Sequence, residues 1–99
     1  MSRFDVYANR HAAGYLLDVQ SDLLGQLNTR VVVPLLLQGT APAAAQRLNP
    51  QFTVQGAPVS MVTQYMAAIP VAELAPPVCS LERERDAILQ AIDFLHQGW

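Results

Sequence analysis

The chain is 99 residues long; 52% of its residues are hydrophobic, only 14% are charged, and none is lysine. This length allows one domain, residues 1–99, built around a single hydrophobic core. So much apolar content in a short chain predicts that part of it lies in a subunit interface, and we expect a homodimer. The net charge of −2 offers no positive surface for a phosphate backbone, which argues against direct nucleic-acid binding.

Three features predict the cellular location. Cys79 is the single cysteine, so the chain cannot form an internal disulfide, and a reducing compartment fits best. Residues 1–9 lack the basic segment and apolar segment of an export signal. The longest apolar run, residues 31–37, is interrupted by Pro34 and is far shorter than the roughly 20 residues that span a bilayer. We therefore expect a cytoplasmic protein without a membrane segment.

Three segments in the first third of the chain have the composition of β-strands. Residues 4–7 alternate apolar and polar side chains, and residues 15–19 are mainly aromatic and aliphatic. Residues 31–33 are all valine, which predicts a strand covered on both faces. Pro34 is expected at a bulge or a sheet edge, because proline has no N–H to donate.

The middle of the chain predicts a β-hairpin. Residues 52–54 and 59–63 alternate around a turn at 55–58, where Gly56 can adopt the positive φ that a tight turn requires. Residues 69–71 are expected to form a further short strand.

A helix is predicted at the end of the chain. Pro76 and Pro77 exclude a helix before Ser80, whose side chain can then cap the first free N–H groups. From there the apolar residues recur with a helical period. The predicted core-facing positions are Leu81, Ile88, Ala91, Ile92 and Leu95. The predicted outward positions are Asp86, Gln90, Asp93 and Gln97. Strands followed by one terminal helix indicate a mainly β antiparallel domain with a C-terminal α-helix.

An apolar pair, Leu23 and Leu24, follows the polar segment at residues 18–22 in a probable loop. Loop residues usually face water. One interpretation is that both leucines fold back onto the core, as scattered apolar residues near strands often do. The other is that they contact a partner.

No pattern in the sequence indicates catalysis. His11 and His96 lie far apart and belong to no metal-binding spacing, and Cys79 lacks the signature of a nucleophile and is expected to be a small core residue. Asp18 and Asp22 resemble an acid/base pair only superficially, because carboxylates at strand ends more often bind backbone N–H groups in turns. We expect neither an enzyme nor a cofactor or metal site.

Several segments together resemble the CcdB family of plasmid-maintenance toxins. The matching positions are residues 4–7, Asp-Val-Gln-Ser-Asp at 18–22, Arg30 with residues 31–35, residues 66–67 and 69–71, Leu81, Ile88, Ala91, Ile92 and Gly98. The combination of Asp-Val-Gln-Ser-Asp with a Val-Pro-Leu strand about a dozen residues later is fairly specific, whereas each piece alone is weak.

The resemblance implies both a fold and a function. The fold would be an SH3-like, partly open antiparallel barrel with a small β lobe and a C-terminal helix, in a homodimer. The protein would bind the gyrase A subunit, trap gyrase in its DNA-cleaved state without chemistry of its own, and be neutralised by a cognate CcdA-like antitoxin. The implied gyrase-binding residues are Leu23, Leu24, Gln90, Asp93, His96, Gln97, Gly98 and Trp99.

The end of the chain departs from the family pattern. Gln97 stands where the family has a near-terminal tryptophan, and Trp99 replaces the final aliphatic residue. Trp99 is expected either to anchor a partner or to pack on its own helix. This change leaves open a non-toxic, degenerate relative. A ribonuclease toxin of the MazF/Kid kind shares the barrel, but it requires a cationic groove and an acid/base pair. The expected antitoxin docking sites are residues 10–14 and 37–46, although both match the family poorly.

Overall fold

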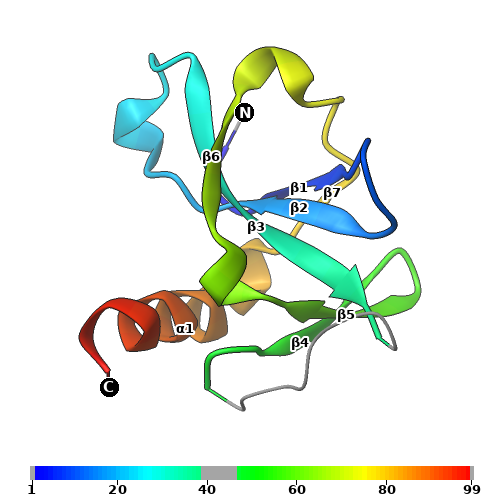
Figure 1. Cartoon of the computed structure of the whole chain (residues 1–99), viewed down its shortest axis with the longest axis vertical. Coiled ribbons are helices and arrows are strands. Elements are labelled where there is room, and N and C mark those ends of the chain that lie inside the picture. Colours follow the sequence, from blue (N-terminus) through cyan, green and yellow to red (C-terminus); the bar gives the residue numbers. More distant parts are fainter. Residues whose placement is uncertain (1, 39–46, 99) are drawn as a thin grey trace.

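The computed structural model describes residues 2–38 and 47–98, and Trp99 and most of the segment 37–46 therefore lie outside the described residues. Figure 1 shows strands that wrap around a core, with one helix along the lower side. The strands are β1 (Asp5–Ala8), β2 (Tyr15–Asp18), β3 (Thr29–Leu37), β4 (Gln51–Val54), β5 (Ala57–Met61), β6 (Ala67–Pro70) and β7 (Cys79–Ser80). The helices are α1 (Arg85–Gln97) and four 3-10 turns, η1 (Asp22–Leu24), η2 (Thr63–Tyr65), η3 (Val71–Glu73) and η4 (Glu82–Glu84).

The strands form one antiparallel sheet that curves into a nearly closed barrel. Its order is β4-β5-β3-β2-β1-β7, and β6 pairs with β3 as well. Helix α1 lies against this sheet and contacts η2 (Figure 1). The prediction of a mainly β fold with a C-terminal helix is confirmed. In the described residues, no helix has the length and apolar character needed to cross a membrane.

The core is filled by side chains of β1 to β5 and of one side of α1, and Cys79 of β7 packs partly against it. Alternation along the strands places Val6, Leu17 and Val33 in the same buried cluster. The helix adds Ile88 and Ala91, both fully buried. Burying a valine, leucine or isoleucine side chain contributes about 1.5–3 kcal/mol. Apolar packing on this side of the sheet therefore holds the barrel together.

Strand β3 organises the sheet, because it pairs with β2 on one edge and with two strands in succession on the other. Its first half pairs with β6 through residues 29–32, and its end pairs with β5 through residues 35–37. Pro34 lies between these two ladders, and its carbonyl accepts a bond from the Val62 N–H at 2.9 Å. The Pro34 nitrogen, which has no hydrogen to donate, faces this same side of β3. Neither the ladder with β5 nor the ladder with β6 requires a donor at this position. The expectation of an edge or bulge position is corrected accordingly, since Pro34 lies inside a long central strand. Both Val32 and Val33 are buried, as a strand covered on both faces requires.

The predicted hairpin is present as β4 and β5, with a tighter turn than expected. Only Gln55 and Gly56 connect the strands, and both have positive φ, 50° and 80°. Two such residues in a two-residue loop match the twist of the flanking strands. Residues 62 and 63 leave the sheet, and Thr63 starts η2.

Helix α1 begins at Arg85, four residues later than a helix capped by Ser80 would begin. Ser80 belongs to β7, which pairs with β1, and the Leu81 N–H donates to the Phe4 carbonyl at 2.9 Å. Tertiary pairing with the first strand thus overrides the helical pattern at this point. The Ser80 hydroxyl still accepts from the Glu82 N–H at 3.1 Å, so it binds the first N–H of η4 and not one of the α-helix.

The helix face was predicted correctly except at its end. Ile88 and Ala91 are buried, Ile92 packs partly on the core, and the outward residues Gln90 and Asp93 are exposed. Leu95 was predicted to face the core but is 38% exposed. The last turn of α1 extends past the sheet, as Figure 1 shows. A side chain there that points in the direction of the core-facing stripe therefore has no core residues to contact.

Candidate protein-binding surface

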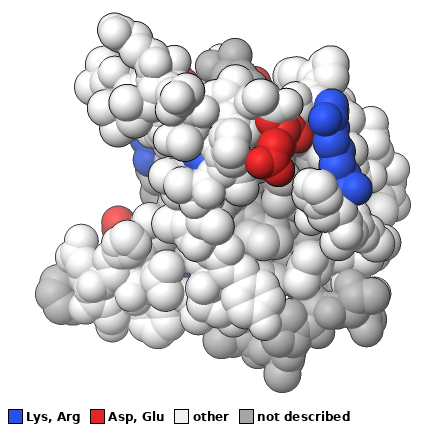
Figure 2. Space-filling view, turned by 45° about the horizontal axis from the view of Figure 1, so that its top comes forward, with Lys and Arg blue, Asp and Glu red and all other residues white. Residues whose placement is uncertain are grey.

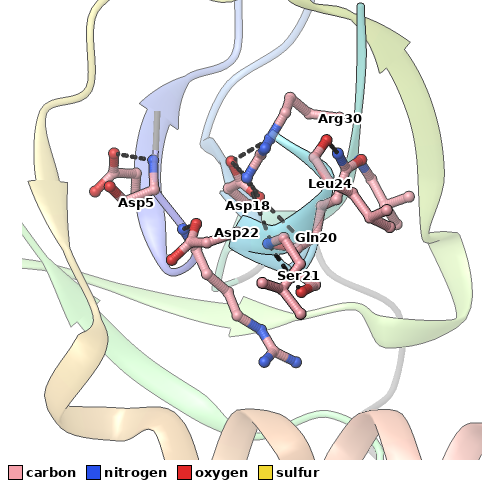
Figure 3. Close-up of polar contacts among 11 residues, drawn as sticks. Asp5, Asp18, Gln20, Ser21, Asp22, Leu24 and Arg30 are labelled. Carbon is pink, nitrogen blue, oxygen red and sulfur yellow. Dashed lines mark hydrogen bonds and ion pairs between the residues drawn. The ribbon is translucent and has the colours of Figure 1, made fainter. Parts of the chain in front are cut away.

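A buried polar cluster lies at the end of β2, where the chain leaves the sheet. The carboxylate of Asp18 accepts two bonds from Arg30, Nε to Oδ2 and Nη2 to Oδ1, both at 2.8 Å. The Gln20 N–H donates to Asp18 Oδ1 at 3.0 Å. These three side chains are at most 5% exposed. We refer to Asp18, Gln20 and Arg30 as the brace; Figure 3 shows them converging from β2, the following loop and β3.

The charges of the brace depend on each other. Burial raises the pKa of Asp18 above its usual value, against the hydrogen bonds from Arg30 and from the Gln20 N–H, which lower it. The bond to Asp18 raises the pKa of Arg30, which stays charged. An ion pair of this kind is strongly destabilised when one partner is removed, because the other charge remains buried. Asp18 therefore serves to hold structure and is not available as a base.

Beyond the brace, residues 22–27 form a projecting tip. Leu23 is 92% exposed and Leu24 is 50% exposed, so neither leucine folds back onto the core. Leu27, which the sequence did not single out, is also 50% exposed. Three large apolar side chains on one short loop are unusual on the surface of a monomer and typical of a contact site. The interpretation that both leucines fold back onto the core is therefore wrong, and their contact with a partner stays a prediction.

The backbone of the tip is tied by local bonds and by one bond to the N-terminal segment. The Ser21 hydroxyl accepts from the Leu23 N–H at 3.2 Å and so caps η1. Asp22 Oδ1 accepts from the Arg3 N–H at 2.8 Å. Asp18 and Asp22 thus both bind backbone N–H groups, as predicted for carboxylates in turns.

The second group of predicted contact residues lies at the end of α1. Gln90, Asp93, His96, Gln97 and Gly98 are all exposed. Gly98 ends the helix with a φ of 81°, and its N–H donates to the Phe94 carbonyl at 2.9 Å. Near the end of the same helix, the Arg47 guanidinium lies 4.6 Å from the centre of the Phe94 ring. Trp99, the last predicted contact residue, lies outside the described residues.

The tip and the end of α1 project from the same side of the molecule, at the upper and lower left of Figure 1. In Figure 2 the two projections flank a hollow, and most of the surface in that view carries no charge. The structure thus places two segments about 65 residues apart in sequence on the same side of the molecule, with apolar side chains on one and polar side chains on the other. Such a concave, weakly charged face is suited to binding a protein.

The remaining candidates take no part in this surface. His11 lies 3.6 Å from Glu73 in an exposed contact. Within residues 2–38 and 47–98, no group of histidine, cysteine and acidic side chains is arranged to hold a metal ion. Cys79 is half-buried against the core, and burial raises the pKa of its thiol, as expected for a packing residue.

The loop expected to receive an antitoxin is exposed at residues 10–13. It closes with a bond from the Asn9 N–H to the Gly14 carbonyl at 3.2 Å, and Gly14 has a φ of 108°. A Cβ at Gly14 would stand 2.5 Å from the Leu35 carbonyl oxygen, so only glycine fits there. Of the second expected segment, only Leu37 and Gln38 lie within the described residues.

Comparison with known families supports the resemblance drawn from the sequence. The family model described as CcdB protein matches residues 3–98. The chain belongs to the CcdB family. Membership implies a toxin of a toxin–antitoxin system directed at DNA gyrase, in a family whose members are gyrase poisons and not enzymes. The match covers β1, the brace, the tip and all of α1, so both groups of predicted contact residues fall within it except Trp99.

Proposed function

We propose that this chain binds the gyrase A subunit through the tip and the end of α1, and traps the complex of gyrase with cleaved DNA. The observation that carries this proposal is Leu23, which is 92% exposed on a hydrogen-bonded loop in a chain of the CcdB family. Exposing such a leucine is unfavourable unless a partner buries it. The proposed contact residues are those predicted from the sequence: Leu23, Leu24, Gln90, Asp93, His96, Gln97, Gly98 and Trp99.

A second copy of the chain is proposed to cover other apolar side chains. Tyr65 on η2 is 54% exposed and Leu95 on α1 is 38% exposed, and these two elements contact each other. Pairing two such surfaces buries both side chains at once, as a twofold-symmetric interface does. Sedimentation of Tyr65→Arg should then show a monomer where the unchanged chain is a dimer.

A cognate antitoxin is proposed to neutralise the toxin by wrapping a disordered segment around it. Such segments order on binding and cover large areas. Exposed residues 10–13 are one docking site that fits this mode. We place the complete system in the cytoplasm, where gyrase acts.

The ribonuclease alternative receives no support from the geometry of the carboxylates. Asp18 is fully buried and bound to Arg30 on both oxygens, so it cannot take a proton from a ribose hydroxyl. Asp22 is engaged by the Arg3 N–H. The non-toxic alternative concerns the end of the chain, and the experiment below separates it.

The decisive experiment incubates purified chain with gyrase, supercoiled DNA and ATP. The proposal predicts linear DNA linked to the gyrase A subunit. Leu23→Asp should abolish it, because a charge would be buried in the contact. Val78→Asp is the matched control, since Val78 is also an exposed apolar residue, at 36%, but belongs to the segment before β7. Linear DNA with Val78→Asp but not with Leu23→Asp supports the proposal.

Two results would contradict the proposal. No linear product from the unchanged chain with gyrase of its own host would favour the non-toxic relative, and cleavage of a structured RNA would favour the ribonuclease. Deletion of Gly98 and Trp99 tests the other half of the surface. If the shortened chain poisons gyrase as well as the full chain, Gly98 and Trp99 are not part of the contact and the proposed surface is wrong at the chain end.

A further inference from the structure

Gln20 is a buried polar residue, only 5% exposed, and it lies outside the hydrophobic core cluster. Its side chain does not bind Asp18 or Arg30. Its amide group instead uses both ends. Nε2 donates to the Leu24 carbonyl at 2.9 Å, and Oε1 accepts from the Val31 N–H at 3.1 Å. The side chain thus spans the loop, from the exposed leucine pair to the first part of β3 (Figure 3).

The backbone of Gln20 is fixed by the other two brace residues. Its N–H donates to Asp18 Oδ1 at 3.0 Å, and its carbonyl accepts from Arg30 Nη2 at 3.4 Å. The backbone of Gln20 is therefore fixed relative to the sheet. The two hydrogen bonds of its side-chain amide then fix the loop relative to β3. The ion pair fixes Gln20, and Gln20 fixes Leu24.

The side-chain bonds that tie the rest of the tip lie at exposed sites: the Ser21 hydroxyl accepts from the Leu23 N–H, and Asp22 accepts from the Arg3 N–H. None of the residues of η1 is buried, and a three-residue 3-10 turn is not stable alone. The Leu24 carbonyl is the central acceptor, because it takes both the Gln20 amide and the Leu27 N–H, the latter at 3.2 Å. Removing the Gln20 donor therefore loosens the residues on both sides of this carbonyl.

We propose that Gln20 is a positioning residue for partner binding: its amide holds Leu24 in the geometry in which Leu23 and Leu24 meet gyrase. This inference rests on the proposed function. The gain is preorganisation, because a tip that samples several shapes binds in proportion to the fraction in the competent shape. Gln20 itself does not touch the partner, and its effect acts through the leucines.

Two substitutions separate the bonds of the amide. Gln20→Glu keeps an acceptor for the Val31 N–H, but its ionised carboxylate has no donor for the Leu24 carbonyl and repels it. Gln20→Met is similar in length and removes both bonds. Val59→Ala is the control, because its truncation destabilises the core: Val59 is fully buried in β5. Strand β5 lies away from the tip (Figure 1).

The experiment measures the affinity of each full-length variant for purified gyrase A subunit, together with amide hydrogen exchange and thermal unfolding. Gln20→Glu should bind at least about five- to ten-fold more weakly, since the tip loses one buried hydrogen bond and a carboxylate then repels the Leu24 carbonyl. The Leu27 amide should exchange faster in this variant while core amides keep their rates. Gln20→Met should lose at least as much affinity. Val59→Ala should unfold at a lower temperature and bind like the unchanged chain.

The outcomes distinguish this inference from the proposed function. If the unchanged chain does not bind the gyrase A subunit, both fail. If it binds and Leu23→Ala weakens binding while Gln20→Glu and Gln20→Met bind normally, only the positioning role of Gln20 is wrong. If Val59→Ala loses as much affinity as the Gln20 variants, the loss follows from lower stability alone. Gln20 would then have only a structural role, which would overturn the inference.

Discussion

The two halves of the candidate gyrase surface are held in place by different kinds of interaction. The tip depends on buried polar groups, since Asp18, Gln20 and Arg30 bind one another and the loop backbone. The end of α1 depends on helical geometry and on apolar packing, with Ile88 and Ala91 in the core. Polar anchors fix one loop in one shape, whereas a helix carries its outward residues at regular angles. The tip should therefore be the half that single substitutions disturb most.

The largest expected effect concerns the ion pair of the brace. Arg30→Met should lower the free energy of unfolding by about 3–5 kcal/mol, because it leaves the Asp18 carboxylate buried without its partner. Urea denaturation measures the loss. The double variant Asp18→Leu with Arg30→Met should recover part of it, since the buried charge is then gone as well. A single substitution that costs no more than the double one would show that the ion pair does not hold the tip.

The buried phenol of Tyr7, whose pKa is affected by Asp18 of the brace, makes the stability of the protein depend on pH. Burial and the charges of Asp18 and Asp5 raise its pKa from 10.0 to about 12. The folded state therefore holds the phenol proton more tightly than the unfolded state, and stability is lost as the pH rises from 10 toward 12. The loss should be about 2–3 kcal/mol.

Urea denaturation of the unchanged chain and of Tyr7→Phe at about pH 9 and about pH 12 measures this effect. Among the described residues, the Tyr7 hydroxyl has no hydrogen-bond partner, so Tyr7→Phe should be at least as stable near neutral pH. Only the unchanged chain should then lose the additional stability at high pH. Parallel losses in both proteins would mean that the Tyr7 phenol is not desolvated.

The end of α1 should respond more weakly. Gly98→Ala should lower the free energy of unfolding by about 1 kcal/mol, because Gly98 has a φ of 81° that other residues adopt only with strain. A Cβ there would meet no atom within 4 Å, so no clash adds to this value. Thermal unfolding measures it, and amide exchange at Leu27 should stay unchanged. A larger loss, or a change at the tip, would show that the two halves are coupled.

The smallest effect is expected at Arg47. Arg47→Gln removes a cation–π contact with Phe94 at an exposed site, which is worth about 0.5–1 kcal/mol. Thermal unfolding at low and at high salt should give nearly the same difference, because the contact does not depend on a paired carboxylate. A strong salt dependence would point to another role for this charge.

The sequence predicted most reliably those elements whose signal is local. The hairpin followed from alternation around Gly56, and the outward positions Gln90 and Asp93 followed from the helical period. Both kinds of signal require only neighbours in the chain. The first residue of α1 could not be predicted from local signals, because Ser80 belongs to β7 and pairs with Asp5, a residue distant in sequence.

The brace was not predictable from periodicity for the same reason. Asp18 and Arg30 become partners only when β2 and β3 pair, with Asp18 opposite Val32. The sequence suggested that Asp18 binds a turn, which is half of its role. Family resemblance supplied Leu23 and Leu24 as contacts, but their exposure, and that of Leu27, became known only from the fold. Leu27 could have been proposed as a contact residue from the sequence, because it follows Leu24 by three positions in the same predicted loop.

The arrangement around β3 has a consequence for how the molecule opens. Strands β2, β5 and β6 all pair directly with β3, so its separation would release all three at once. Small excursions are then confined to elements that do not pair with β3, such as β4, β7 and the projecting loop. Deuterium uptake along residues 29–37 is therefore expected to follow the global opening equilibrium, and the slowest-exchanging amides of the chain should lie there.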